Sequence, residues 1–241
     1  NSVMKVLITG SNGFIGNNLR VHLSERNDIE VVTFSRDDDL GSLGSKLDCV
    51  DFVFHLAGVN RPKNVEEFAL GNADLTSALC QAIIQTKRLI PVIYTSSVQS
   101  ELDNPYGESK KAAEQVLMDF SVQVRSPIYL FRLPNVFGKW CKPNYNSAVA
   151  TFCYNIAHDL PILINDANAK VRLVYVDDVV KRFMSIMDGT LVEPGLNNVN
   201  PVYEVTLGGL AEKIQLFKDS RQSLLTESVG TGFYRALHST Y

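Results

Sequence analysis

Short apolar runs alternate along this chain with longer segments in which apolar residues recur every three or four positions. The short runs predict buried strands, and the longer segments predict helices that pack by one face. The strands are expected at 4–9, 29–34, 50–56, 89–95 and 128–132, and the helices at 14–25, 40–47, 75–84 and 106–120. This alternation is typical of βαβ units, so we expect an α/β fold with a doubly wound parallel sheet of the Rossmann type.

The segment between Arg36 and Asp51 is too short for a helix and a further strand. It has room for the short helix at 40–47 and little else. A third strand normally occupies this edge of a doubly wound sheet. We therefore expect edge strand 3 to be missing or vestigial, which gives a strand order of 2-1-4-5-6.

The pattern loosens after Pro134, where short elements are separated by loops. Helices are expected at 147–158, 179–187 and 207–217, with a strand at 172–176. These segments predict a small C-terminal lobe. The stretch 218–241 is polar and has no clear period, so it is expected to be a tail or a linker.

Composition argues against several classes of partner. The 241 residues carry a net charge of −3, which gives no reason to expect nucleic acid or an acidic membrane surface. No apolar run approaches the ~20 residues that a membrane helix needs. The four cysteines show neither paired nor metal-ligand spacing, so we expect reduced thiols, a cytoplasmic location and no bound metal.

A glycine-rich turn follows the first strand and opens the first helix. Gly10 permits the tight turn, Gly13 lets the backbone approach a pyrophosphate, and Gly16 lets the helix pack closely on the strand. The helix N-terminus then faces the phosphates. The candidate cofactor contacts in this stretch are Gly10, Asn12, Gly13, Phe14, Ile15 and Gly16. A simple strand-to-helix turn is the alternative, and it is less favoured because strand, glycine spacing and helix occur together.

The end of the second strand indicates which dinucleotide is bound. Binders of the non-phosphorylated cofactor usually place Asp or Glu here, to accept a hydrogen bond from the ribose 2′-hydroxyl. This chain has Ser35 and Arg36 instead, and a hydroxyl with a guanidinium suits a 2′-phosphate. We therefore expect NADPH, although the acidic run 37–39 follows closely and the alternative is a solvated surface arginine.

Two further stretches lie near the expected cofactor. At the end of the third strand, Leu56, Ala57 and Gly58 are expected to lie beside it, whereas His55 is interpreted as a core histidine without a chemical role. Asn72, at the start of the next helix, is expected to brace the active-site backbone.

Tyr106 and Lys110 carry the chemistry that we expect. A tyrosine hydroxyl has a pKa near ~10, and a lysine four residues later on the same helix can stabilise the phenolate. Ser97, at the end of the preceding strand, can donate a hydrogen bond to a substrate oxygen as negative charge develops, and strand alternation favours it over Ser96. The set predicts a ketoreductase in which the tyrosine protonates the carbonyl oxygen, the serine orients it and the lysine holds the cofactor ribose.

These motifs together resemble the extended short-chain dehydrogenase/reductase superfamily over residues 4–217. The matching motifs are Thr9-Gly-x-x-Gly-x-x-Gly16, His55-Leu-Ala-Gly58, Tyr106-x-x-x-Lys110, Arg132-x-x-Asn135-x-x-Gly138 and Tyr175-Val-Asp-Asp178. Their positions predict one domain, mainly an NADP-binding core at 4–134 and mainly a substrate lobe at 135–217. The resemblance implies that Pro134 borders the nicotinamide and that Asn135 contacts a nucleotide-sugar.

A narrower resemblance is to the capsular-polysaccharide and O-antigen reductases that carry a zinc cupin domain. It rests on Gly58-Val-Asn-Arg-Pro62, Asp103-Asn-Pro-Tyr-Gly-Glu-Ser-Lys110 and Asn135-Val-Phe-Gly-Lys-Trp-Cys-Lys-Pro-Asn-Tyr-Asn146. It implies NADPH-dependent reduction of the C-4 ketone of a UDP-4-keto-6-deoxy-N-acetylhexosamine, forming UDP-2-acetamido-2,6-dideoxy-L-talose for capsule or O-antigen synthesis. The residues implied to line the sugar and diphosphate pocket are Arg61, Asn135, Trp140, Lys142 and Asn144.

The resemblance also implies a homodimer and a partner activity. In these enzymes a cupin domain epimerises C-3 before the reduction, and this chain stops about where that domain would begin. We therefore expect the reduction step alone, no zinc site, and residues 218–241 as a linker toward an absent cupin domain. Arg172 lies one position from the superfamily's usual diphosphate-binding arginine, so its role stays open.

Two other functions stay open. One is a nucleotide-sugar 4,6-dehydratase or 4-epimerase of the same fold. A dehydratase would want an Asp-Glu pair after Ser97, where Val98-Gln99 stands, and a 4-epimerase would want an acidic residue near Ser35. The other is a non-catalytic NADP-sensing module, which needs the glycine turn but no proton donor.

Overall fold

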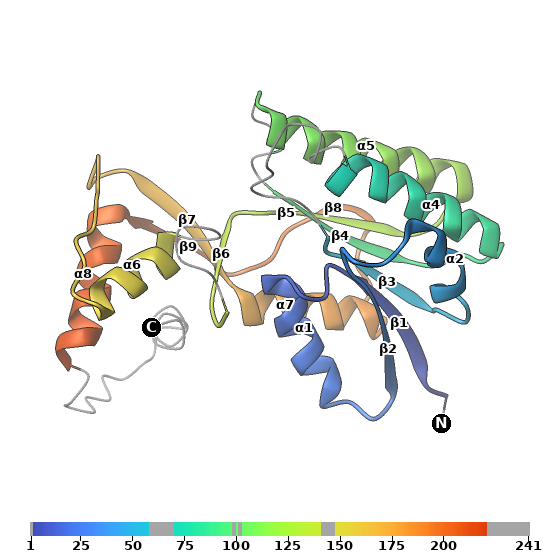
Figure 1. Ribbon diagram of the computed structural model, residues 1–241, viewed down its shortest axis with the longest axis horizontal. Coiled ribbons are helices and arrows are strands. Elements are labelled where there is room, and N and C mark those ends of the chain that lie inside the picture. Colours follow the sequence, from blue (N-terminus) through green and yellow to red (C-terminus); the bar gives the residue numbers. More distant parts are fainter. Residues whose placement is uncertain (1, 58–69, 98–99, 101–102, 141–147, 221–241) are drawn as a thin grey trace. The chain divides into compact units, whose positions relative to one another are not determined.

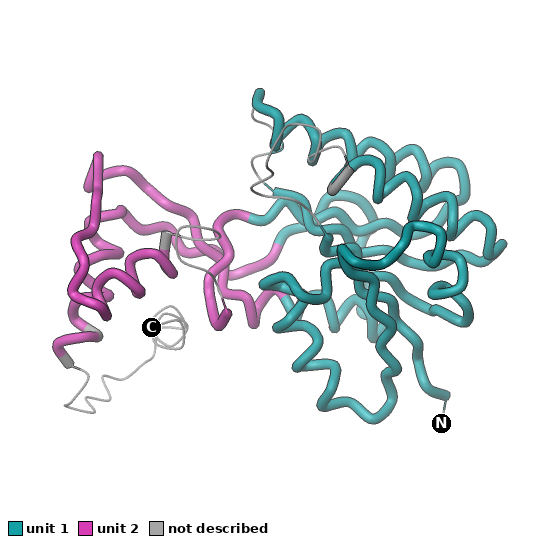
Figure 2. The backbone as a smooth tube through the Cα atoms, viewed as in Figure 1, with its two compact units in different colours: residues 1–133, 180–198 teal, residues 134–179, 199–241 magenta. Residues whose placement is uncertain are grey.

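A computed structural model of the chain describes residues 2–57, 70–97, 100, 103–140 and 148–220. Contacts between residues divide the chain into two compact units, which are coloured separately in Figure 2. The first unit comprises residues 1–133 and 180–198, and the second comprises residues 134–179 and 199–241.

The first unit is built on a six-stranded sheet in the order β2-β1-β3-β4-β5-β8, and every neighbouring pair is parallel. Its strands are β1 (Met4–Thr9), β2 (Ile29–Phe34), β3 (Phe52–His55), β4 (Val92–Ser97), β5 (Ile128–Leu133) and β8 (Gly195–Asn197). Its helical segments are α1 (Phe14–Ser24), η1 (Leu40–Ser42), α2 (Leu43–Lys46), η2 (Leu70–Asp74), α4 (Leu75–Thr86), α5 (Pro105–Val124) and α7 (Val176–Met187), which begins in the second unit.

Helices cover both faces of this sheet. In Figure 1, α2, α4 and α5 lie on one face and α1 and α7 on the other. The predicted doubly wound parallel fold is therefore confirmed. The missing edge strand is confirmed as well, because residues 35–51 contain only η1 and α2, and β2 ends the sheet. Strand β8, on the opposite edge, was not predicted.

The central strands are buried on both faces, as parallel strands between helices must be. Val6, Leu7 and Ile8 of β1 and Val53 and Phe54 of β3 are fully buried. Such strands are continuous apolar runs rather than alternating patterns, which is why the sequence shows them so clearly.

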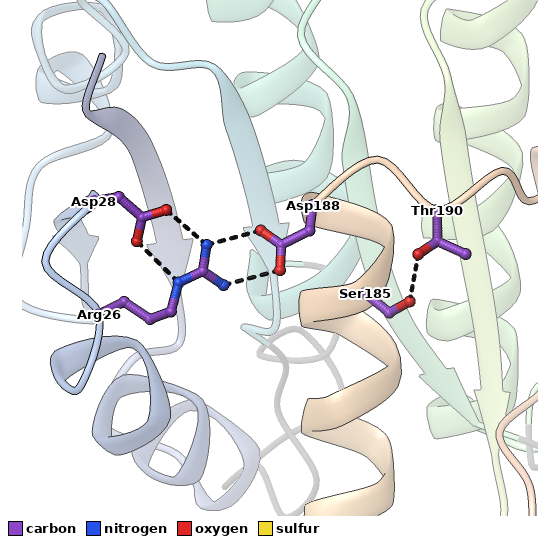
Figure 3. A network of polar contacts seen from close by, with 5 residues as sticks. All are labelled: Arg26, Asp28, Ser185, Asp188 and Thr190. Atoms are coloured by element: carbon purple, nitrogen blue, oxygen red, sulfur yellow. Dashed lines mark hydrogen bonds and ion pairs between the residues drawn. The ribbon is translucent and has the colours of Figure 1, made fainter. Parts of the chain in front are cut away.

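Residues 180–198 return to the first unit after the excursion into the second. The ring of Phe183 in α7 lies with its centroid 5.0 Å from that of Phe131. At the end of α7, Asp188 accepts two hydrogen bonds from the guanidinium of Arg26, at 2.8 and 2.9 Å, and Asp28 takes the other side of the same fork (Figure 3). Apolar packing and a planar ion pair thus fix this segment beside the start of β2.

The second unit contains a three-stranded sheet in the order β6-β7-β9. Its elements are β6 (Asn135–Phe137), α6 (Ala148–Ala157), β7 (Lys170–Tyr175), β9 (Val202–Thr206) and α8 (Leu207–Ser220). Strands β6 and β7 are parallel, whereas β7 and β9 are antiparallel. Its core gathers apolar side chains from these elements, among them Phe137, Phe152, Leu173, Leu210 and Ile214. Within the described ranges, no helix is long and apolar enough to cross a membrane.

Candidate active site

The glycine turn between β1 and α1 requires glycine at two positions. Gly10 has a φ of +71°, and its N–H donates to the Phe34 carbonyl at 3.1 Å. A Cβ on Gly10 would lie 2.7 Å from the Ala57 backbone, and a Cβ on Gly16 would lie 2.3 Å from the Gly10 carbonyl oxygen. These contacts leave no space for a side chain, so both residues shape the turn itself.

Gly13 differs because a Cβ there would meet only the Gly10 carbonyl oxygen, at 3.3 Å, and its φ of −76° suits any residue. It caps α1 without a side-chain hydrogen bond to the helix. The first N–H groups of α1 therefore face outward beside a bare backbone, which fits the pyrophosphate of a dinucleotide. Phe14 and Ile15, both half-buried, belong to this first helical turn.

Arg20 supports the glycine turn, and the sequence reading did not single it out. Its guanidinium donates to the Asn12 side-chain oxygen at 3.0 Å and to the Ser11 carbonyl at 3.3 Å. Because Asn12 is held in this way, it acts within the turn as a structural acceptor. The signal in the sequence was a cation two helical turns after the glycines.

The predicted selector residues follow β2 directly. Ser35 is half-buried, and both its N–H and its hydroxyl donate to the Asp38 carboxylate. Arg36 is exposed and forms no ion pair among the described residues. The carboxylate at Asp38 is therefore part of the region in which a 2′-phosphate was expected.

The predicted catalytic residues come together where β4 ends and α5 begins. Asn104 caps α5 by accepting the Gly107 N–H at 2.7 Å, and Tyr106 lies in the first turn. The Tyr106 and Ser97 side chains share a hydrogen bond. Burial raises the pKa of the Tyr106 hydroxyl, while this hydrogen bond lowers it. The tyrosine is therefore protonated at neutral pH and can act as a proton donor.

Lys110 lies one turn further along α5 and is almost completely buried. Its ammonium donates to the Thr95 carbonyl at 3.2 Å and lies 5.1 Å from the centre of the Tyr94 ring. Burial lowers the pKa of Lys110 from 10.5 to about 8, and the nearby Glu114 carboxylate acts in the opposite direction. Lys110 therefore keeps its positive charge at neutral pH, one helical turn from Tyr106.

Strand alternation separates the two serines of β4. Ser96 donates to the Glu114 carboxylate at 2.8 Å, and Arg132 of β5 donates to the other oxygen of that carboxylate at 3.0 Å. Ser97 contacts Tyr106 instead. Sequence reasoning missed Glu114 as a buried support for α5, although it lies four residues after the lysine.

His55 is a buried structural link, as interpreted from the sequence. Its Nδ1 lies 2.6 Å from the Thr9 hydroxyl and its Nε2 lies 2.8 Å from the Thr76 hydroxyl. Burial, together with the charge of Lys110, lowers the pKa of His55 to about 3. The imidazole is therefore neutral and joins the end of β1 to α4.

Asn72 holds the backbone of the catalytic tyrosine through one intermediate. Its side-chain amide donates to the Ser109 hydroxyl at 2.8 Å, and that hydroxyl donates to the Tyr106 carbonyl at 2.8 Å. Asn72 lies in the π-helical turn η2, a distortion that is frequent at functional sites. The expected bracing of the active-site backbone is therefore present in the structure.

The remaining predicted residues are more dispersed. Leu56 and Ala57 follow β3 beside the glycine turn, whereas Gly58, Arg61, Lys142 and Asn144 lie outside the described residues. Pro134, Asn135 and Trp140 belong to the second unit. Trp140 is 43% exposed, has a φ of +72°, and carries the Lys139 ammonium 4.8 Å from its ring centre. Arg172 is exposed on β7.

Among the residues that the structure describes, no group of three or more His, Cys, Asp or Glu side chains is arranged to hold a metal ion. The phenol of Tyr106 and the hydroxyl of Ser97 share a hydrogen bond, and the ammonium of Lys110 lies one helical turn further along α5. Such an arrangement can protonate an oxygen while negative charge develops on it.

Comparison with known proteins agrees with this geometry. The pattern of the NAD dependent epimerase/dehydratase family matches residues 6–194. A UDP-2-acetamido-2,6-beta-L-arabino-hexul-4-ose reductase of Pseudomonas aeruginosa is 56% identical over 238 residues, which cover 99% of this chain and 64% of the relative. The chain thus spans less than two thirds of that relative.

Solved structures of other proteins have a similar fold. The capsular polysaccharide assembling protein CapF of Staphylococcus aureus superposes with a TM-score of 0.86 at 38% identity, covering 99% of this chain and 64% of that one. UDP-glucuronic acid 4-epimerase of Bacillus cereus, in complex with NAD, superposes with a TM-score of 0.84 at 18% identity, covering 99% and 97% of the two chains. At that identity the second likeness shows the fold alone.

Proposed function

Because the chain belongs to the NAD dependent epimerase/dehydratase family, we propose that it is an NADPH-dependent reductase of a nucleotide-sugar ketone. The substrate is a UDP-4-keto-6-deoxy-N-acetylhexosamine, and reduction at C-4 forms UDP-2-acetamido-2,6-dideoxy-L-talose for capsular or O-antigen polysaccharide. The observation that carries this proposal is the 56% identity to the Pseudomonas aeruginosa reductase across 99% of this chain.

The proposed chemistry uses the three side chains that converge at the start of α5. Tyr106 donates its hydroxyl proton to the C-4 carbonyl oxygen, and Ser97 orients that oxygen by a hydrogen bond. Reduced nicotinamide, when bound, supplies the hydride for the carbon. Lys110 holds the ribose hydroxyls and stabilises the phenolate that forms as the proton leaves. The glycine turn and the start of α1 hold the pyrophosphate.

Further parts of the proposal concern the rest of the chain. The segment 4–134 mainly holds NADP, and 135–217 mainly holds the sugar. The residues proposed to contact the UDP-sugar are Arg61, Asn135, Trp140, Lys142 and Asn144. The enzyme works as a homodimer and receives its substrate from a cupin epimerase.

The test measures loss of reduced-nicotinamide absorbance with the purified chain and a UDP-4-keto-6-deoxy-N-acetylhexosamine. NADPH is compared with NADH, each with and without an added cupin epimerase. Oxidation that favours NADPH supports the proposal, and dependence on the epimerase identifies the accepted C-3 isomer. No oxidation under any condition, with NADPH still bound, overturns it in favour of an NADP-sensing module.

The matched variant is Tyr106→Phe, which removes the proton donor and keeps the ring. Turnover should fall by ~10²–10⁴-fold, the usual contribution of positioned proton transfer. NADPH affinity should stay within about threefold of wild type, which corresponds to less than 1 kcal/mol. Full turnover in this variant would refute the role of Tyr106.

A further inference from the structure

Two hydrogen-bond donors of Ser35 and the ammonium of Lys46 converge on one oxygen of Asp38 at the end of β2. The Ser35 N–H lies 2.8 Å from Asp38 Oδ2, and the Ser35 hydroxyl lies 3.3 Å from the same atom. The Lys46 ammonium lies 3.7 Å from it and also donates to the Thr33 carbonyl at 2.8 Å. In return, the Asp38 N–H donates to the Ser35 carbonyl at 3.0 Å, which closes the turn.

This cluster lies beside the glycine turn. Phe34, the last residue of β2, pairs with Thr9 and accepts a hydrogen bond from the Gly10 N–H. Ser35 is the next residue, so its donors lie where the adenosine ribose is expected in this fold. Lys46 reaches the same place from the end of α2.

The donor set suits a phosphate oxygen as well as a carboxylate oxygen. Both are anionic acceptors that take short hydrogen bonds from a backbone N–H, a hydroxyl and an ammonium. The Asp38 carboxylate and a bound phosphate cannot both contact Ser35 and Lys46, because their negative charges would then lie close together and repel each other. The Asp38 side chain is about one third exposed, so it has room to turn toward solvent.

We propose that Asp38 is an internal competitor for the 2′-phosphate of NADPH, and that Lys46 is a cation which both anions use in turn. This inference rests on the proposed preference for NADPH. In the free protein the Asp38 carboxylate holds the donors in place. On binding, the 2′-phosphate displaces it and takes over the Ser35 and Lys46 contacts, and the exposed Arg36 adds a second cation.

The test is isothermal titration calorimetry with two small probes that need no sugar substrate. Adenosine 2′,5′-bisphosphate carries the 2′-phosphate, and 5′-AMP lacks it. Asp38→Asn should tighten binding of the bisphosphate by about tenfold and leave 5′-AMP within about twofold, because the competing charge is gone. Lys46→Met should weaken the bisphosphate by about tenfold or more and also leave 5′-AMP unchanged.

Two controls keep these results specific. Asp37→Asn removes an equal charge from an exposed neighbour and should change bisphosphate affinity by less than about threefold. In the double variant, Lys46→Met should cost more in the Asp38→Asn background than in wild type, because the lysine then no longer has a competing partner. Thermal melts of every variant confirm that it is folded.

Three results with the Asp38→Asn variant or the double variant would overturn the proposal. Unchanged or weaker bisphosphate binding in Asp38→Asn, or strict additivity in the double variant, would show that Asp38 does not compete. Weaker 5′-AMP binding in Asp38→Asn would show that the carboxylate accepts the ribose 2′-hydroxyl, which favours the non-phosphorylated cofactor. Because these titrations contain no ketosugar, they can succeed when the reductase assay fails, and the reverse.

Discussion

Lys110 carries its charge in a place where burial disfavours charge. Its pKa falls from 10.5 to about 8 on folding, so between these values the unfolded chain binds more protons than the folded one. Stability associated with this group therefore rises with pH across that window and is lost as pH falls toward 8. Each unit of pKa difference corresponds to about 1.4 kcal/mol.

Replacing Lys110 with Met should remove this titration. The variant should gain most over wild type in free energy of unfolding at pH 7, and the gain should shrink toward pH 10. Urea unfolding at pH 7, 8, 9 and 10 measures the difference. Lys111→Met, at an exposed neighbouring position, is the control and should show a difference that does not vary with pH. A pH-independent difference for Lys110→Met would contradict the prediction.

His55 should affect the free energy of unfolding at acidic pH, in contrast to Lys110. Its pKa is about 3 when folded against 6.5 in an ordinary environment, so the unfolded state binds more protons between these values. Stability is therefore lost as pH falls below 6.5. In His55→Gln this part of the acid loss should disappear, whereas His158→Gln, on the surface, should retain it. Urea unfolding from pH 7 to 4 tests this, and equal acid slopes in all three proteins would refute it.

The sequence could predict which site residues lie together when they are close to each other along the chain. Tyr106 and Lys110 are one helical turn apart, so their spacing alone places them together. The link from Asn72 to Tyr106 passes through Ser109. Glu114 of α5 is held by Ser96 of β4. Such contacts depend on how distant elements pack, which no local pattern encodes.

At the scale of the element, glycine has two roles in the turn into α1. Gly10 and Gly16 shape the turn, whereas Gly13 leaves space for a pyrophosphate. Gly13→Ala should leave the chain folded, because the φ is ordinary and the Gly10 carbonyl oxygen, 3.3 Å from the new Cβ, has to shift only slightly. The methyl group should nevertheless stand where the pyrophosphate approaches. Dinucleotide affinity should fall by about tenfold or more, measured by calorimetry, while the melting temperature changes little.

The control is Gly44→Ala in α2, where nothing lies within 4 Å of the new Cβ. That change should stabilise the protein by about 0.5–1 kcal/mol, because alanine is the better helix former. It should leave dinucleotide affinity unchanged. Equal affinity losses in the two variants would show that Gly13 has no special position.

Long elements could be predicted and short ones could not. Strands β1 and β2 begin and end where the apolar runs do. Strands β6 and β8 contain three residues each, and their pairing partners are distant in the sequence, so nothing local distinguishes them from loops. Strand β9 was missed although Val202 and Val205 are β-branched, because its surroundings read as irregular.

At the scale of the molecule, the Arg26 guanidinium binds Asp188 and so fixes the segment 180–198, which returns to the first unit from far along the chain. Asp188→Asn should keep the shape of one partner and remove its charge. Because this pair is partly exposed, the free energy of unfolding should fall by only about 0.2–1 kcal/mol, and the loss should shrink in 1 M salt. Denaturant unfolding at two salt concentrations measures both, and a loss that is equal at both would rule out a screened ion pair.

The type of fold could be predicted because alternation of strands and helices leaves few topologies. The absent edge strand could be predicted from segment length alone. The return of residues 180–198 to the first unit could not, because it depends on Phe183 and on the pairing of β8 with β5. These are long-range contacts between short pieces of chain.

The absent strand leaves β2 with a single neighbour among the described strands. The Phe34 carbonyl points toward β1, where it meets Gly10, so by alternation the Thr33 carbonyl points outward. An open backbone edge is a template on which another chain can add a strand, and lysine is a common guard against such aggregation. Lys46 caps the Thr33 carbonyl and places a charge there. The side chain proposed to bind cofactor therefore also protects the solubility of the sheet.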